Sequence, residues 1–213
     1  MSRHDMIKGI IPPIITPMNE DESFNEAEFR NQIERQIEGG VHGIFCYGTN
    51  GECYALNTQE KEEVLKVAVD QIKGRVPVYA GTGCITTKET VEMSKRAEAL
   101  GADILSVITP YFAAVSQEEL YEHYATVAEA VKIPIVLYNI PARTGCSIAP
   151  ETVGRLAEID NIVGAKDSSG NFNNILEYIA KTDKNFSVLS GNDALIIWNL
   201  LAGGTGGIAG CAN

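Results

Sequence analysis

Short apolar runs alternate with amphipathic stretches along nearly the whole chain. The apolar runs end in turn-forming residues, and between them apolar residues recur three or four positions apart, as at Phe29, Ile33 and Ile37. A short apolar run closed by turn residues is typical of a buried strand, and the wider spacing is typical of one face of a helix. The pattern therefore predicts strands and helices in regular alternation.

The expected elements can be placed along the chain from these patterns. Strands are expected at 9–17, 41–47, 76–80, 104–108, 134–138, 162–166, 186–190 and 207–209. Helices are expected to begin at capping sequences around Asn25, Asn57, Thr86 and Ser116, and to cover 150–159, 171–181 and 193–201. Phe24 is placed to pack on the first helix, and residues 140–145 are expected to form a loop.

The regular repeat of strand and helix narrows the choice of fold. The units recur roughly every 30 residues, which is the size of a strand–helix–strand unit and indicates parallel strands. A doubly wound open sheet would satisfy this alternation too. Eight units without a break between two domains favour a (β/α)8 TIM barrel, which forms a single domain over residues 1–213.

The last expected strand lies at the very end of the chain. A barrel of this kind typically needs about 250 residues, whereas this chain stops at Asn213 and shows no eighth helix. We therefore expect that the carboxy-terminal helices are missing from this chain. We also expect strands one and eight to present open apolar edges.

Composition and charge exclude several classes of protein. The chain is 45% hydrophobic and 21% charged, as in an ordinary globular domain, and its net charge of −11 gives no electrostatic basis for binding nucleic acid. It contains neither a cleavable signal sequence nor an apolar run long enough to span a membrane. Five scattered cysteines without a C-x-x-C motif indicate a reduced, cytoplasmic protein without disulfides or a zinc site.

In a barrel, the loops that follow the strands form the active face, and the sixth strand ends there in Lys166. A lone lysine at a strand end usually reaches into solvent. The alternative is an amine at the rim of an apolar pocket, where the neutral form is favoured and can attack a carbonyl.

Other chemically useful groups occupy the same kind of position. The sequence GTNGE at 48–52 leaves backbone N–H groups and the Thr49 hydroxyl free for a carboxylate, although it could be a plain turn. Tyr138 ends the fifth strand and could pass protons to a carbonyl oxygen, or could be an aromatic residue with a solvated hydroxyl. Arg143 could bind a carboxylate or be a solvated loop charge.

Three segments together carry a resemblance to a known family. GTNGE at 48–52, YNIPARTG at 138–145 and GAKD at 164–167 resemble the signature regions of the dihydrodipicolinate synthase / N-acetylneuraminate lyase family. The resemblance covers essentially the whole chain, with the segments in family order. It implies a pyruvate-dependent class I aldolase on a TIM barrel that needs no cofactor and is usually a homotetramer, a dimer of dimers.

The resemblance also implies roles for particular residues. Lys166 forms the imine with the pyruvate ketone, and Tyr138 relays protons through Thr49. The implied substrate-binding residues lie in the loops after the strands and are Gly48, Asn50, Arg143, Gly191 and Ile208. The implied substrates are pyruvate and a small aldehyde.

The aldehyde is less well defined, because the relevant positions disagree. Arg143 matches the residue that binds aspartate semialdehyde in the synthases, and this favours a dihydrodipicolinate synthase. Phe112 stands where a synthase usually supplies a tyrosine across the dimer interface, and Tyr111 is expected to point elsewhere. Asn50 resembles 2-keto-3-deoxy-acid or 4-hydroxy-2-oxoglutarate aldolases, and an N-acetylneuraminate type is a further alternative. Ile85 gives no support for inhibition by lysine.

Two other classes of function compete with this interpretation. A metal-dependent aldolase would need clustered ligands, but His4, His42 and His123 fall on three separate segments. A non-catalytic barrel is the more distant alternative, and the expected open edges of strands one and eight make it more plausible.

Overall fold

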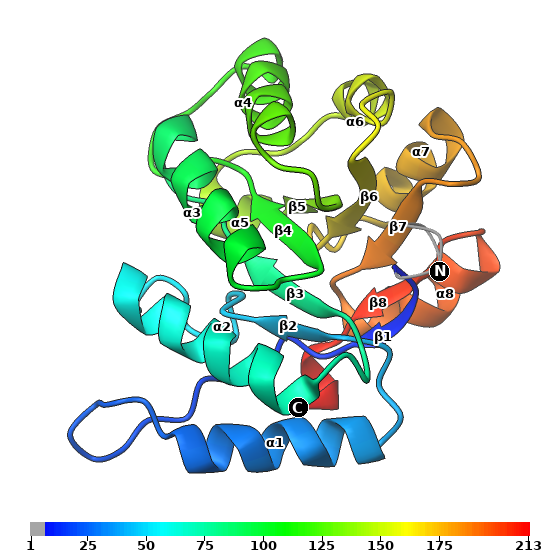
Figure 1. The fold of residues 1–213 in the computed structure, drawn as a ribbon. Coiled ribbons are helices and arrows are strands. Elements are labelled where there is room, and N and C mark those ends of the chain that lie inside the picture. The colour runs from blue at the N-terminus through cyan, green and yellow to red at the C-terminus, as the bar shows by residue number, and fades with distance from the viewer. Residues whose placement is uncertain (1–6) are drawn as a thin grey trace.

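The computed structural model describes residues 7–213, so His4 lies outside the described residues. The strands are β1 (Gly9–Ile11), β2 (Ile44–Cys46), β3 (Val78–Gly81), β4 (Ile104–Ile108), β5 (Ile135–Asn139), β6 (Ile162–Asp167), β7 (Ser187–Ser190) and β8 (Gly206–Ile208). The α-helices are α1 (Glu26–Glu38), α2 (Thr58–Ile72), α3 (Thr87–Ala99), α4 (Gln117–Ala130), α5 (Pro141–Thr144), α6 (Pro150–Leu156), α7 (Phe172–Lys181) and α8 (Ile196–Leu201). Figure 1 shows the strands at the centre with the helices around them.

All strands run parallel in one sheet, in the order β1-β8-β7-β6-β5-β4-β3-β2. Gly9 and Ile11 of β1 pair with Gly206 and Ile208 of β8. On the other side, the N–H of His42 donates to the carbonyl of Ile10 (2.8 Å), and the N–H of Phe45 donates to that of Pro12 (3.0 Å). The barrel therefore closes, and the predicted (β/α)8 fold is confirmed.

The expectation of open edges on strands one and eight is wrong. The pairing of β1 with β8 uses only the backbone groups of three residues on each strand. All three residue pairs are formed, so these two strand edges are covered. The first strand is shorter than expected because Pro12 and Pro13 follow it and have no N–H to donate.

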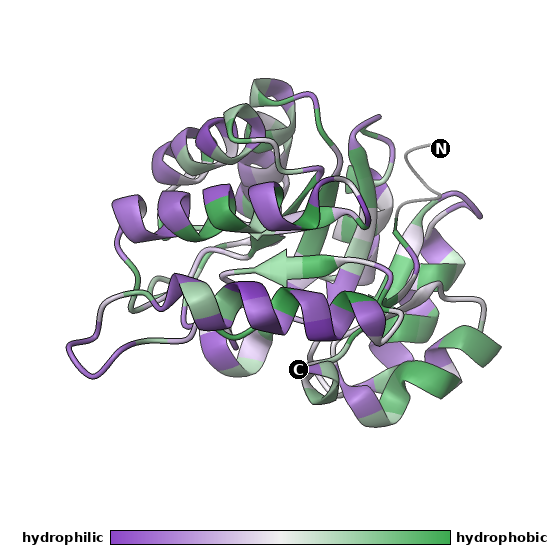
Figure 2. Ribbon diagram, turned by 60° about the horizontal axis from the view of Figure 1, so that its bottom comes forward, coloured by the Kyte–Doolittle hydropathy of each residue, from purple (hydrophilic) through white to green (hydrophobic). Residues whose placement is uncertain are grey.

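Two apolar layers hold the barrel together. Side chains from alternate strand positions fill its interior: Ile11, Phe45, Tyr79, Ile104, Val136, Val163, Leu189 and Ile208. A second, larger core lies between the strands and the surrounding helices. Figure 2 shows hydrophobic colour along the strands and hydrophilic residues over much of the helices. Because the interior is packed, a substrate can enter only at the ends of the strands.

The helices begin where their capping residues predict. The side chains of Asn57 and Ser116 form full capping boxes, and Asn25 accepts from the N–H of Glu28 at 3.0 Å. The rings of Phe24 and Phe29 pack edge to face with centroids 5.3 Å apart, as expected for a hydrophobic staple.

Several other boundaries differ from the sequence prediction. The expected loop at 140–145 contains a helical turn, α5, which begins at Pro141 and is followed by Gly145 in the left-handed conformation. Helix α6 ends at Leu156, and the chain then tightens, with the N–H of Ile159 donating to the carbonyl of Leu156. Residues 193–195 form a 3₁₀ turn before α8.

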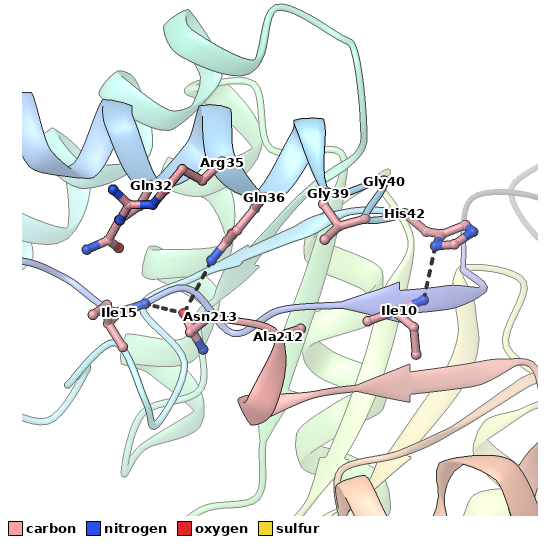
Figure 3. A pocket seen from close by; sticks show the side chains of 11 residues that line it. Ile10, Ile15, Gln32, Arg35, Gln36, Gly39, Gly40, His42, Ala212 and Asn213 are labelled. Atoms are coloured by element: carbon pink, nitrogen blue, oxygen red, sulfur yellow. Dashed lines mark hydrogen bonds between the residues drawn. The ribbon is translucent and has the colours of Figure 1, made fainter.

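A cavity of about 680 Å³ lies between α1 and β1 and reaches the end of the chain. Figure 3 shows Asn213 in its wall, where the side-chain oxygen accepts from the N–H of Ile15 (3.0 Å) and the amide of Gln36 (3.3 Å). After β8, the described residues contain a 3₁₀ turn (Gly210–Ala212) and no α-helix. None of the helices in the described range is long and apolar enough to cross a membrane.

Candidate active site

Lys166 is the second-last residue of β6 and points into the end of the barrel. Its side chain is only 4% exposed. The ammonium nitrogen Nζ lies 3.8 Å from the centroid of the Tyr138 ring and 5.5 Å from that of Phe45. The register of β5 and β6 explains this contact, because Tyr138 and Lys166 are Cα partners. The amine is thus held against aromatic faces, as the pocket interpretation expects.

The hydroxyl of Tyr138 contacts a second hydroxyl from the opposite side of the barrel mouth. Thr49 Oγ1 and Tyr138 Oη are 3.1 Å apart, a hydrogen bond in which either group could donate. Thr49 lies in the tight turn after β2. Gly51 of this turn packs closely, since a Cβ there would lie 2.8 Å from the carbonyl oxygen of Ile14. Close packing of the turn fixes the position of the Thr49 hydroxyl.

A buried network supports the end of β6 from behind. Asp167 is 1% exposed, and its Oδ2 accepts from the side-chain amides of Asn139 (2.7 Å) and Asn174 (2.6 Å). Its Oδ1 accepts from the N–H (3.0 Å) and hydroxyl (2.5 Å) of Ser169. Asn139 in turn accepts from the N–H of Ile148 at 3.1 Å. These bonds satisfy the carboxylate without a cation and fix the backbone that carries Lys166.

Sequence reasoning missed this network. Asn139 and Asp167 follow Tyr138 and Lys166 directly, but only the register of β5 and β6 shows that they pair across the strands. Asn174 lies on α7, and nothing in its local sequence points to the carboxylate. The one available signal was a carboxylate at the end of an apolar strand, where a charged group needs partners.

Gly191 follows β7 and packs directly on Lys166. A Cβ at this position would lie 2.7 Å from Cε of Lys166 and would also collide with the hydroxyl of Ser168. The N–H of Gly191 donates to the carbonyl of Asp167 at 2.7 Å. Only glycine leaves the lysine room to reach its present position.

The expected site residues converge on a cavity of about 540 Å³ at the carboxyl end of the barrel. Its lining includes Thr49, Asn50, Tyr138, Arg143, Lys166, Gly191 and Ile208. Gly48 does not line this cavity. It borders a smaller chamber that also contacts Thr49 and Tyr138.

Arg143 lies on α5 and borders a second cavity of about 480 Å³ as well. Thr49 and Asn50 line both cavities. Tyr111 lines the second cavity, so it faces the region of Arg143 rather than pointing elsewhere as expected. Burial raises the pKa of its phenol.

Phe112 is 96% exposed and borders neither cavity, and its backbone is in the left-handed region with φ of 79°. A positive φ is uncommon for a residue with a bulky side chain.

The histidines of the described residues lie apart from one another. His42 Nδ1 accepts from the N–H of Ile10 at 3.2 Å, and His123 Nδ1 bonds the Thr87 hydroxyl at 2.9 Å. Across residues 7–213, no three His, Cys, Asp or Glu side chains gather where they could hold a metal ion.

Fold and site together define a (β/α)8 barrel with a buried lysine against a tyrosine ring at the carboxyl end of its strands. The family model for the dihydrodipicolinate synthetase family matches residues 6–213, and the chain belongs to this family.

Similar proteins carry consistent names. The chain is 43% identical over 209 residues to a 4-hydroxy-tetrahydrodipicolinate synthase of Methanopyrus kandleri, covering 97% of this chain and 70% of that protein. It is 45% identical to a protein of the same name from Syntrophus aciditrophicus, covering 98% and 71%. The interpretation as a dihydrodipicolinate synthase-like lyase agrees with these names and is confirmed at that level.

Solved structures share the fold closely. A dihydrodipicolinate synthase of Bacillus anthracis superposes with a TM-score of 0.95 at 33% identity, covering 97% of this chain and 70% of that chain. YagE, a prophage protein of the dihydrodipicolinic acid synthase family from E. coli K12, was solved in complex with pyruvate. It has a TM-score of 0.94 at 36% identity, with the same two coverages.

Proposed function

We propose that the chain condenses pyruvate with an aldehyde through an imine on Lys166. The observation that carries this proposal is the placement of the Lys166 amine, buried against the Tyr138 ring at the wall of the 540 Å³ cavity. A lysine nitrogen at the wall of a cavity can add to the carbonyl of a substrate that enters the cavity.

The first step is addition of the Lys166 nitrogen to the ketone carbon of pyruvate, giving a carbinolamine. The hydroxyl of Tyr138 donates its proton to the carbinolamine hydroxyl, the C–O bond breaks, and water leaves as the nitrogen lone pair forms the C=N bond. Thr49, whose hydroxyl oxygen lies 3.1 Å from the Tyr138 oxygen, donates a hydrogen bond that stabilises the phenolate until the next step restores its proton.

The imine then makes the neighbouring methyl carbon acidic. The Tyr138 phenolate takes one proton from this carbon, which gives an enamine and restores the phenol. The enamine carbon forms the new C–C bond with the aldehyde carbon as the aldehyde oxygen takes the Tyr138 proton. Water then hydrolyses the imine, which restores the Lys166 amine and returns a proton to Tyr138. Each step runs in reverse for cleavage.

We assign the pyruvate carboxylate to the Thr49 hydroxyl, the backbone N–H groups of residues 49–50 and the Ile208 region. Gly48 supports this turn, and Gly191 leaves room for the lysine. In support, Thr49, Asn50, Gly191 and Ile208 line the same cavity wall as Lys166. Backbone N–H groups in a tight turn form a local anion site, which an acidic protein needs.

We assign aspartate semialdehyde as the second substrate, with Arg143 binding its carboxylate. Arg143 borders both cavities, and the salt bridges of the described residues do not include it, so its guanidinium is available. Phe112 and Asn50 favour the alternative, a sugar-derived or hydroxy-keto-acid aldehyde.

A panel of aldehydes with pyruvate tests this assignment. Aspartate semialdehyde should react with a higher kcat/KM than glyoxylate or sugar-derived aldehydes. Arg143→Leu should raise KM for aspartate semialdehyde about tenfold or more and leave KM for pyruvate unchanged, because a carboxylate loses its paired charge. Equal effects on all aldehydes would contradict the role of Arg143.

The Phe112→Tyr variant distinguishes the two branches. Phe112 is almost fully exposed, so the added hydroxyl should not disturb the fold. A synthase that works without this hydroxyl should show unchanged turnover of aspartate semialdehyde. Faster turnover of this aldehyde by the tyrosine variant alone would place the natural enzyme among the aldolases for other aldehydes.

We also propose a cytoplasmic homotetramer built as a dimer of dimers. Two separate surfaces could form the contacts between subunits. One is around the exposed Phe112, and the other is the exposed apolar face of α8, which carries Ile197, Trp198 and Leu201. In support of a cytoplasmic location, all five cysteines are free. One similar structure, at 34% identity, is described as a monomeric dihydrodipicolinate synthase variant. Sedimentation equilibrium tests the assembly, and a monomer would contradict it.

A further inference from the structure

A small chamber lies directly beside the Tyr138–Thr49 pair, on the inner side of the barrel. Its volume is about 20 Å³, and its walls include Phe45, Gly81, Ser106, Thr49 and Tyr138. A site of roughly 10 to 15 Å³ is enough for one water molecule when polar groups surround it. The chamber therefore has the size for a single water.

Ser106 is the polar group of the inner wall that lacks a partner. Its side chain is 1% exposed, and its hydroxyl forms no hydrogen bond with any of the described residues. A buried hydroxyl without a partner costs free energy, and native proteins satisfy nearly all of them. The chamber beside it is the place from which a partner can come.

The sheet register explains why space exists at this point. Ser106 and Gly81 are Cα partners on β4 and β3, so no side chain from β3 fills the position opposite the serine. Two residues further along β4, on the same face, Ile108 is the partner of Tyr138. Ser106 thus lies one inward-facing layer below the phenol.

We propose that Ser106 holds one water molecule in this chamber, and that this water donates a hydrogen bond to the phenol oxygen of Tyr138. Ser106 is then a positioning residue that acts through the water. This inference rests on the proposed function, because it concerns the step in which Tyr138 gives up its proton.

The need for a second donor follows from that step. When Tyr138 protonates the departing carbinolamine hydroxyl, its oxygen becomes a phenolate until the proton returns. Thr49 supplies one hydrogen bond to this oxygen, and the water supplies another from inside. Phe112 has no hydroxyl that could serve instead. The water donates a hydrogen bond but transfers no proton. It therefore stabilises the negative charge on the phenolate oxygen without changing the proton balance of the reaction.

Ser106→Ala removes the hydroxyl that anchors the water, and Ser106→Val also fills the chamber. Both should lower kcat about tenfold, since a hydrogen bond to a charged oxygen is worth at least that factor. KM for pyruvate should stay within about twofold, because the carboxylate contacts are untouched. Ser94→Ala is the matched control. Ser94 lies on α3, outside the chamber, and its buried hydroxyl donates a hydrogen bond to the hydroxyl of Thr82 at 2.9 Å.

The split between kcat and KM separates this role from a packing effect, because a packing defect at this wall would also displace the carboxylate contacts and raise KM for pyruvate. Other groups around the phenol are unchanged by the substitution: Lys166 over the ring, Cys53 and Tyr47 in the chamber, and Arg143 in the outer cavity.

A high-resolution crystal structure of the unaltered protein tests the water itself. Density for a water within hydrogen-bond distance of both Ser106 Oγ and Tyr138 Oη is expected. A dry chamber, or an unchanged kcat in Ser106→Ala, would overturn the inference. Trapping of pyruvate on Lys166 of the same protein shows whether the proposed function stands independently of that outcome.

Discussion

Lys166 owes its chemical character to its immediate neighbours. Its side-chain nitrogen lies 3.8 Å from the centroid of the Tyr138 ring, and the residue is only 4% exposed. A lysine side chain over an aromatic face is attracted to the ring. The Tyr138 ring therefore holds the Lys166 nitrogen at the wall of the 540 Å³ cavity.

Replacement of Gly191 by alanine tests how tightly the lysine is held. The new Cβ would lie 2.7 Å from Lys166 Cε, so the amine must shift. We expect a loss of at least about 100-fold in kcat/KM, because misplacement by about 1 Å can cost that much. Gly39→Ala is the control, since its backbone is helical and its Cβ would have no contact closer than 3.3 Å. Equal activity of the two variants would contradict the tight fit.

Tyr138→Phe separates the ring from the hydroxyl. The ring over Lys166 remains, but the oxygen that bonds Thr49 is lost. We expect kcat to fall by about 10²- to 10⁴-fold, the usual contribution of a positioned proton donor, while the fold is kept. Turnover within a factor of a few of the unaltered protein, measured with purified folded variant, would exclude Tyr138 as the donor.

Much of the site could be predicted at this scale, and the limits are physical. Lys166, Tyr138 and Thr49 end strands or begin the turns after them, and parallel strands in a barrel end on one face. The partners of Asp167 and the close approach of Gly191 depend on register and on loop paths. Neither the pattern of apolar residues nor turn chemistry determines these.

Among the elements, the pair β5–β6 has a special role. It carries Tyr138 and Lys166 as one cross-strand pair, and Asn139 and Asp167 as the next. One pair faces the cavity, and the other is tied to α7 through Asn174. The position of Tyr138 and Lys166 therefore depends on the buried carboxylate of Asp167.

Asp167→Asn tests this dependence. An amide would place N–H groups against the donors of Asn139, Asn174 or Ser169, so at least two hydrogen bonds to a charged oxygen are lost. We expect the free energy of unfolding to fall by about 3 kcal/mol. Asp183→Asn, at an exposed carboxylate that accepts only from the N–H of Asn185, should cost less than about 1 kcal/mol. Similar losses in the two variants, by urea denaturation, would show that the network is not critical.

Element boundaries were predictable to the extent that local signals set them. Asn57 and Ser116 fix the starts of α2 and α4 through their own side chains. The turn α5 was missed because Pro141 and Gly145 also suit a loop. Helix α6 ends where the chain forms a tighter turn after Leu156. No residue in this segment is a recognisable helix-ending signal, so the sequence did not indicate this end.

At the scale of the whole molecule, α3 and α4 are joined by a buried histidine. His123 is 4% exposed and bonds Thr87 through Nδ1, and its Nε2 lacks a partner among the described residues. Burial lowers the pKa of His123 to about 4. The folded protein thus holds this imidazole neutral at pH values where the unfolded chain would protonate it.

This difference predicts a loss of stability in acid. Between an unfolded pKa of about 6.5 and a folded pKa of about 4, the unfolded state binds more protons, so stability falls as the pH falls through this window. His123→Asn should remove this part of the dependence, which amounts to about 2 to 3 kcal/mol between pH 7 and pH 4. Unfolding by urea at several pH values checks it, and parallel curves for both proteins would contradict it.

The barrel was predictable as a whole because eight strand–helix units leave few arrangements. Its closure was not, since the pairing of β1 with β8 involves only backbone groups of Gly9 to Ile11 and Gly206 to Ile208. Hydropathy does not indicate which strand edges meet. The closed barrel fixes the distance between Thr49 after β2 and Tyr138 on β5, and so it fixes the geometry of the site.

The central claim is that Lys166 forms an imine with pyruvate. Incubation with pyruvate and borohydride, followed by peptide mass mapping, tests it directly. The account predicts a reduced pyruvate adduct on Lys166 alone, with no adduct on Lys61 of the neighbouring cavity and none in Lys166→Arg. An unmodified Lys166 in folded protein, or modification of another lysine instead, would contradict it.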